Sequence, residues 1–140
     1  MKYVKRVRNG LAAMGVVAAG VAAATWGLTT MPREACSAQE KVSFADDVAP
    51  VLREHCVSCH HPGGPGYDKS GLDLSTWAGL MKGTKYGPVV TPGDADTSNL
   101  MWLLDWRATP ELRMPHGKKK LSICDRDTIR TWIYQGAKDN

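Results

Sequence analysis

Cys56-Val57-Ser58-Cys59-His60 lies near the middle of the 140-residue chain. Two cysteines that are two residues apart and directly followed by a histidine are typical of covalent haem attachment. Each thiol can bond to one vinyl group of the same porphyrin, and the histidine then points at the iron. By composition alone, such a run is expected on the order of a few times in a thousand chains. The motif therefore predicts Cys56 and Cys59 as covalent haem attachments and His60 as an axial iron ligand. Such a histidine also needs an acceptor for its other ring nitrogen, and we expect a backbone carbonyl of the loop at residues 62–65 to supply it.

Two other kinds of site use the same cysteine spacing. A thioredoxin-like redox pair needs a βαβ setting, whereas a Gly- and Pro-rich loop at residues 61–66 follows this motif. A structural zinc site needs two more Cys or His ligands at regular spacing, and Cys124 is the one other cysteine downstream. Haem attachment is the interpretation that the surrounding sequence favours.

The second axial ligand must come from a distant segment, because the other face of a haem is covered by another part of the chain. Met114 is the best candidate, since it lies in a Pro-bounded loop and a thioether suits low-spin iron. His116 is the alternative and would give a haem of lower potential. Met81 and Met101 lie in predicted helices, where methionine is more often core filler.

The pattern from residue 43 onward predicts a helix that leads into the motif. Ser43 and Asp46 form a capping box, and Pro50 should bend the helix or locally tighten its turn. The helical spacing is carried by Phe44, Val48, Val51 and Leu52.

Three further helices are predicted downstream. The first is short and follows an extended piece within residues 71–82, with its cap near Ser75. A loop at residues 87–93 separates it from a helix that starts at Thr97 or Ser98 and ends before Pro110. The last begins with a second capping box from Ser122 to Asp125 and closes at Gly136. Its apolar stripe consists of Ile129, Trp132 and Ile133.

The N-terminus has the layout of an export segment. Four basic residues between Lys2 and Arg8 precede a charge-free run over residues 10–32, which predicts one hydrophobic helix and places the rest of the chain on the periplasmic side. The length of the run favours an uncleaved single-span anchor, and cleavage near Ala38 is the alternative. The predicted domains are therefore an anchor at 1–38 and a haem domain at 39–140.

The charge distribution excludes a broad nucleic-acid-binding surface. The net charge of +4 arises within residues 1–38, and the remaining residues contain thirteen basic and thirteen acidic side chains. One local cluster, Lys118-Lys119-Lys120, follows the loop of Met114. It could steer an acidic redox partner, or it is a solvated run that keeps the surface soluble.

Taken together, these segments resemble the class I cytochrome c fold and, more narrowly, the planctomycete-type cytochrome c domain family. The resemblance covers roughly residues 42–137 in unbroken order. Its matching segments are Phe44 to Leu52, Cys56 to His60, Gly71 to Leu74, Val90 to Asp94, Arg113 to Pro115, Leu121-Ser122 and Trp132 to Ala137.

The resemblance implies an all-α domain of three to five helices around one covalently bound haem c, with His60 and Met114 as axial ligands. It also implies that the first and last helices cross near Phe44 and Trp132. Cys124 is not part of the family pattern, and it is either a small buried hydrophobe or the partner of Cys36. Members of the family are often fused to larger modules, so a chain with this domain alone would work with a separate polypeptide.

The resulting hypothesis is a membrane-tethered mono-haem electron carrier, not an enzyme, that serves as a subunit of a respiratory or photosynthetic complex. With both axial positions filled by protein, the iron has no open position for small-molecule chemistry, and outer-sphere electron transfer remains. The competing hypothesis is a haem sensor or haem enzyme in which Met114 dissociates.

Overall fold

The computed structural model describes Cys36 and residues 41–140, and over these residues the fold is helical. The elements in chain order are η1 (Phe44–Val48), α1 (Ala49–His55), α2 (Pro65–Ser70), α3 (Trp77–Lys82), α4 (Asn99–Leu104), η2 (Pro110–Leu112) and α5 (Ile123–Tyr134). Pairing between extended segments in this part of the chain is limited to two isolated bridges, Thr84 with Gly87 and Thr91 with Asp94. The predicted all-α class is confirmed for the described residues.

The predicted hydrophobic helix and anchor at residues 10–32, and the domain boundary after residue 38, lie outside the described residues. Within the described part, none of the helices is both long enough and apolar enough to cross a membrane.

The first helix begins with a wide turn. Ser43 Oγ accepts a hydrogen bond from the Asp46 N–H at 3.2 Å, as the capping box predicts, but the carboxylate that accepts from the Ser43 N–H belongs to Asp47, at 2.7 Å. Of the two effects predicted for Pro50, bending of the helix or tightening of its turn, the tightening was wrong, because η1 is a π-helix. Pro50 lacks an N–H and its ring crowds the carbonyl four residues earlier, so an extra residue in the preceding turn relieves the clash.

Helix α2 was not predicted. The loop expected after the motif ends at Gly64, and Pro65 then occupies the first turn of α2. Gly71 closes the helix with a φ of 73°, a left-handed conformation that glycine adopts without steric cost. Proline at the start and glycine just past the end of a helix were the available signals.

The later helices start close to their predicted positions. The side chain of Thr76, one residue after the predicted cap, accepts from the Gly79 N–H and caps α3. Ser98 precedes α4 but makes no capping bond. Instead, its buried hydroxyl accepts from the Thr91 N–H at 2.9 Å and so ties the preceding loop to the helix. The Ser122 cap of α5 is confirmed by a 3.0 Å bond from the Asp125 N–H.

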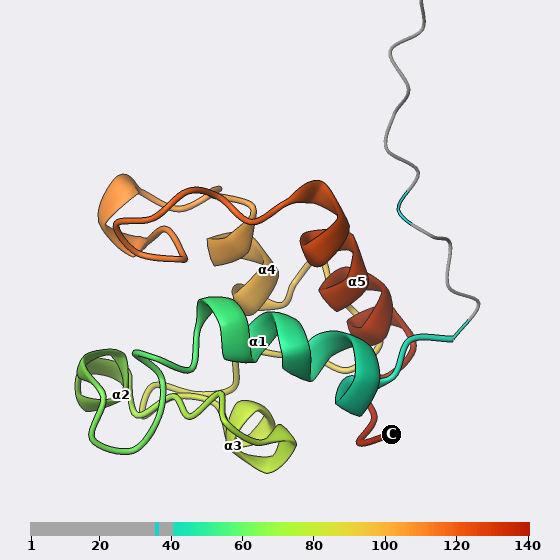
Figure 1. The fold of residues 1–140 in the computed structure, drawn as a ribbon, viewed down its shortest axis with the longest axis horizontal. Coiled ribbons are helices and arrows are strands. Elements are labelled where there is room, and N and C mark those ends of the chain that lie inside the picture. Colours follow the sequence, from blue (N-terminus) through green and yellow to red (C-terminus); the bar gives the residue numbers. More distant parts are fainter. Residues whose placement is uncertain (1–35, 37–40) are drawn as a thin grey trace, which may run out of the picture. The chain divides into compact units, whose positions relative to one another are not determined.

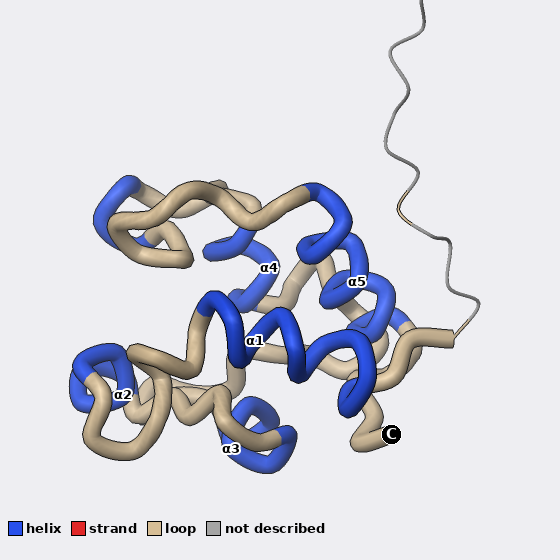
Figure 2. The backbone as a smooth tube through the Cα atoms, in the orientation of Figure 1, coloured by secondary structure: helices blue, strands red, loops and turns tan. Residues whose placement is uncertain are grey.

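One apolar core joins the helices. Phe44 and Trp132 pack with their ring centroids 5.4 Å apart and their planes inclined by 43°, which confirms the predicted crossing of the first and last helices. Figure 1 shows α5 beside the start of the first helix, and Figure 2 shows long irregular connections between the short helices. The largest apolar side chains that are fully buried are those of Val48, Leu52, Leu80, Met101, Leu104, Ile129, Trp132 and Ile133.

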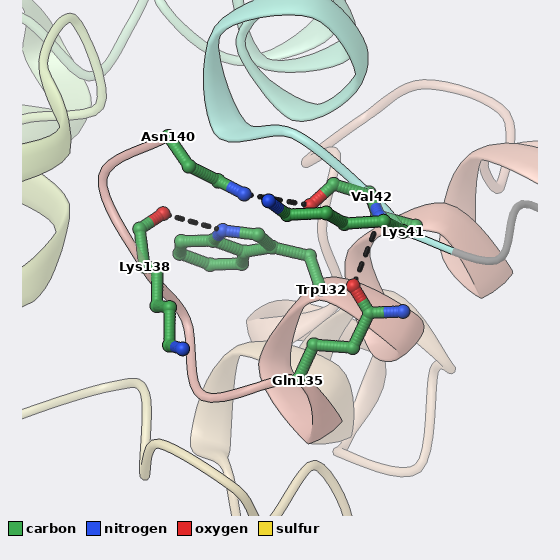
Figure 3. Close-up of a pocket in the computed structure, with 6 residues that line it drawn as sticks. All are labelled: Lys41, Val42, Trp132, Gln135, Lys138 and Asn140. Atoms are coloured by element: carbon green, nitrogen blue, oxygen red, sulfur yellow. Dashed lines mark hydrogen bonds between the residues drawn. The ribbon is translucent and has the colours of Figure 1, made fainter.

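Residues at the two ends of the domain hold each other in place around Trp132. The Val42 N–H donates to Gln135 Oε1 at 2.9 Å, and Asn140 Nδ2 donates to the Val42 carbonyl at 3.3 Å. The indole N–H of Trp132 donates to the Lys138 carbonyl at 2.9 Å. Figure 3 shows these bonds around a small pocket that Lys41 also lines. The segment before η1 is therefore fixed to the end of α5.

A disulfide joins Cys36 to Cys124 across a sequence separation of 88 residues. Of the two alternatives for Cys124, the structure shows pairing with Cys36. Cys124 lies in the first turn of α5, so the bond attaches Cys36 to this helix.

Asp105, at the C-terminal end of α4, binds two arginines of α5. One carboxylate oxygen lies 2.6 Å from Arg126 Nη1 and the other 2.7 Å from Arg130 Nη2. Burial opposes ionisation, but the hydrogen bonds from Arg130 and Arg126 hold the pKa of Asp105 below its usual range. These bonds connect α4 to α5 outside the apolar core.

We expect Asp105→Asn to lower the free energy of unfolding at neutral pH by about 2 kcal/mol, because the side chain of Asp105 is only 13% exposed. A group whose folded-state pKa is depressed stabilises the fold above its unfolded pKa, and this contribution disappears as the pH falls through the folded-state pKa. The difference between the variants should therefore shrink from about pH 4 downward. Urea denaturation of the two proteins at neutral and acidic pH measures this difference.

Asp127→Asn is the matched control, since the Asp127 carboxylate is 3.7 Å from Arg130 and its side chain is 47% exposed. Its effect should stay below about 0.5 kcal/mol. Equal effects of the two substitutions would show that the bonds of Asp105 to Arg126 and Arg130 do not stabilise the fold more than an exposed ion pair does.

Candidate functional site

The motif forms a hydrogen-bonded turn directly after α1. The N–H groups of Cys56 and Val57 both donate to the Leu52 carbonyl at 2.9 Å, and the His60 N–H donates to the Cys56 carbonyl at 3.0 Å. The Leu74 N–H in turn donates to the His60 carbonyl at 2.8 Å. This wound backbone holds the two thiols and the imidazole within a single short segment.

Both motif cysteines are free thiols. Cys56 is half-buried and Cys59 is exposed. Burial raises the pKa of Cys56 to about 11, against a decrease caused by Lys118 and with a smaller increase caused by Cys59. The Cys56 thiol is therefore neutral near pH 7, and Lys118 is close enough to act on it electrostatically. Cys56 and Met114 both pack against the apolar core.

The imidazole of His60 has a buried nitrogen with no partner. We expected a carbonyl of the 62–65 loop to accept from this ring, but the Pro62 carbonyl instead lies 2.9 Å from Nδ1 of His61. Nδ1 of His60 is buried without a hydrogen bond of acceptable geometry. Burial lowers the pKa of His60, and the nearby backbone of Leu72 offsets part of the decrease. A neutral imidazole is the form that binds a metal.

Glycine allows the backbone to pack closely against the other edge of this ring. A Cβ on Gly66 would lie 2.9 Å from both Cε1 and Nε2 of His60 and 3.0 Å from the Cys59 carbonyl. A Cβ on Gly64 would lie 2.5 Å from the same carbonyl. The chain after the motif therefore packs so closely around it that side chains at these positions are excluded. Two free thiols and a neutral imidazole that lacks a hydrogen-bond partner at Nδ1 fit a covalently attached haem.

Both backbone polar groups of Met114 are hydrogen-bonded. The Met114 N–H donates to the Leu103 carbonyl at 3.2 Å, and the Met114 carbonyl accepts from the indole N–H of Trp106 at 2.9 Å. The side chain is half-buried against the core, whereas His116 is exposed. Met101 is fully buried and Met81 packs against the core, as predicted for core methionines.

The three lysines of the cluster at residues 118–120 have different interactions. Lys118 acts on Cys56, and Lys120 Nζ donates to the Asp105 carbonyl at 2.7 Å. Two nearby arginines lie over aromatic rings, Arg107 at 4.0 Å from the Trp102 centroid and Arg113 at 5.5 Å from that of Trp106. Figure 1 shows the loop around η2 and the chain around α2 on the same side of the domain, away from the C-terminus.

Sequence reasoning missed two residues that shape this site. Gly66 was assigned to a loop, although its place behind Pro65 at the start of a helix was a signal that backbone approaches the motif there. Trp106 gave no signal, because its hydrogen bond to Met114 depends on a left-handed backbone that a tryptophan rarely adopts.

A family model described as Planctomycete cytochrome C matches residues 56–116, from the first cysteine of the motif to just beyond Met114. The matched segment confirms the resemblance proposed from the sequence and implies haem c as the cofactor. Neither a curated protein nor a solved structure gives a match.

We expect Gly66→Ala to reduce covalent haem loading several-fold. Alanine normally stabilises a helix relative to glycine by about 1 kcal/mol, but here its Cβ would displace the His60 ring. The ratio of haem absorbance to protein measures loading. Gly63→Ala is the control, since it strains a backbone with a φ of 85° but no atom lies within 4 Å of the added Cβ. Normal loading of Gly66→Ala would show that the packing around His60 is not required.

Proposed function

Since residues 56–116 match the planctomycete cytochrome C family, we propose that this chain is a mono-haem c-type cytochrome that transfers single electrons between redox partners. The observation that carries the proposal is the His60 imidazole, which is neutral and buried at Nδ1 and stands beside two free thiols. No packing requirement of the helices explains this arrangement, whereas haem attachment needs all three groups.

In this proposal Cys56 and Cys59 hold the haem, and His60 and Met114 are its axial ligands. When bound, the haem supplies a reversible one-electron change at iron, and its ligands and burial set the potential. The hydrogen-bonded turn of the motif fixes His60, and the two main-chain bonds of Met114 fix the opposite ligand. Both protein ligands are thus held by their backbones before any electron arrives, which limits reorganisation during transfer.

The proposed role is that of a carrier and not of an enzyme. Methionine at the sixth position would leave no open coordination site for a substrate, and the restrained backbone of Met114 opposes its withdrawal. His116 is a weaker candidate for this position, because it is exposed and its ring makes no hydrogen bond with the described residues.

We also propose that a separate acidic polypeptide, a subunit of a larger respiratory or photosynthetic complex, docks close to Met114. Lys118 and Lys119 support this idea, because both are exposed and follow the Met114 loop directly in the chain. Lys120 contributes less, since its ammonium is bound to the Asp105 carbonyl. Steering by such charges depends on ionic strength.

The proposed location is outside the cytoplasm, on the periplasmic side of the membrane. The disulfide between Cys36 and Cys124 supports it, because such bonds persist in oxidising compartments. We propose further that residues 10–32 remain as a single-span anchor. In favour of this, Cys36 is bonded to Cys124, and cleavage near Ala38 before that bond forms would discard one of its two partners.

The axial ligand can be tested in the haem-loaded protein. We expect Met114→Ala to abolish the far-red methionine-to-iron band and to let carbon monoxide bind the reduced iron rapidly. His116→Ala should retain the band and bind carbon monoxide slowly, as the unmodified protein does. Rapid carbon monoxide binding by the unmodified protein at neutral pH would instead favour a sensor or enzyme with a labile ligand.

The fate of the N-terminal segment can be tested by intact mass under reducing and non-reducing conditions. Protein purified from membranes should have the same mass, apart from two protons, in both conditions, and it should contain Cys36. A lower mass after reduction would show that the chain is cut between Cys36 and the haem domain and that only the disulfide retained the segment. Cys124→Ser provides the control without the bond.

A further inference from the structure

Trp106 has an unusual backbone for a large side chain. Its φ is 61°, in the left-handed region, where the Cβ of an L-residue is crowded. Trp106 follows Asp105 at the end of α4, and its N–H donates to the Leu103 carbonyl at 3.2 Å. A single glycine would satisfy this turn without strain. The chain therefore places tryptophan here for what its side chain does.

Neighbouring contacts hold this strained turn in place. Both carboxylate oxygens of Asp105 are bound by arginines of α5, and the Asp105 carbonyl accepts from Lys120 at 2.7 Å. On the side chain, the guanidinium of Arg113 lies 5.5 Å from the Trp106 ring centroid, and Arg113 Nε donates to the Ala108 carbonyl at 3.3 Å. The turn is thus tied to α5 on one side and to the Met114 loop on the other.

The indole of Trp106 is hydrogen-bonded to the backbone of Met114. Its Nε1–H donates to the Met114 carbonyl at 2.9 Å, and the Met114 N–H donates to the Leu103 carbonyl at 3.2 Å. Both main-chain polar groups of Met114 are therefore fixed to the 103–106 turn. We infer that Trp106 is a positioning residue that strengthens iron ligation by Met114 by fixing the backbone of that ligand, an inference that rests on the proposed function.

A positioned ligand resists displacement by an external one. If the Met114 backbone were free, the thioether could swing away at little cost, and a competing ligand in solution would find the iron more often. With the backbone held, displacement must also disrupt the indole bond. Loss of one hydrogen bond of this kind corresponds to about a tenfold change in an equilibrium constant.

The test is a titration of the oxidised, haem-loaded protein with imidazole, which binds iron only when methionine leaves. Trp106→Phe keeps an aromatic ring under Arg113 and removes only the N–H donor. We expect its apparent affinity for imidazole to rise about tenfold and its far-red band to weaken. Trp102→Phe is the matched control, because Trp102 is 43% exposed and its ring also lies under an arginine, Arg107. It should titrate like the unmodified protein.

The Met114→Ala background separates positioning from general stability. Trp106→Phe should not change imidazole affinity further in this background, because there is no thioether left to position. A further change of similar size would overturn the inference. If Met114→Ala alone leaves the affinity unchanged, the ligand assignment itself fails. If Met114→Ala raises the affinity and Trp106→Phe does not, only the role of Trp106 fails.

If the Trp106→Phe protein does not fold well enough to be purified, a measurement on the unmodified protein still tests the inference. Hydrogen exchange at the Trp106 indole, followed by NMR in the unmodified holoprotein, should be slow and should accelerate when imidazole displaces Met114. Exchange that is unaffected by imidazole would overturn the inference.

Discussion

The contact between Phe44 and Trp132 fixes the position of α1, and the proposed site is built at the far end of that helix. The two rings pack the start of the first helix against α5. Hydrogen bonds between the Val42 backbone and the side chains of Gln135 and Asn140 hold the residues before this helix. Because η1 and α1 are continuous, the motif turn at residues 56–60 is placed by a contact made a dozen residues earlier.

The second half of the site depends on α5 through a different interaction. Asp105 is held by Arg126 and Arg130, and the turn that follows supplies Trp106. The motif is thus placed by apolar packing against α5, whereas the Met114 loop is placed by charged hydrogen bonds to the same helix. Apolar packing tolerates small shifts, while these bonds have narrow geometric requirements, which suits a loop that must position one sulfur atom.

The parts of the fold that were predictable from sequence are those set by local rules. The caps at Ser43 and Ser122 and the apolar stripe ending at Ile133 follow from spacing within a few residues. The sequence could not show whether the turn before Pro50 is tighter or wider than an α-helical turn, because either change avoids the clash with the proline ring. The partner of His60 Nδ1 was wrongly predicted, since His61 and not His60 lies beside the Pro62 carbonyl.

The residues of the candidate site come from the sequence, whereas the contacts that support those residues come from the structure. The residue types of Cys56, Cys59, His60 and Met114 carry chemistry that spacing reveals. Trp106 and Gly66 act through long-range or backbone contacts that leave no periodic trace. The lysine cluster shows the same limit, because the bond of Lys120 to Asp105 joins residues that are 15 apart.

The pairing of Cys36 with Cys124 has a consequence for how the protein matures. Any other disulfide among the four cysteines would consume Cys56 or Cys59, so only this single bond leaves both as thiols that can accept a haem. The chain must therefore be oxidised at one pair while it stays reduced at another, in one compartment. Cys56 and Cys59 are near neighbours in sequence, so they would be the easier pair to oxidise. Assembly thus requires either a reductant that selects the neighbouring pair or haem attachment that outruns its oxidation.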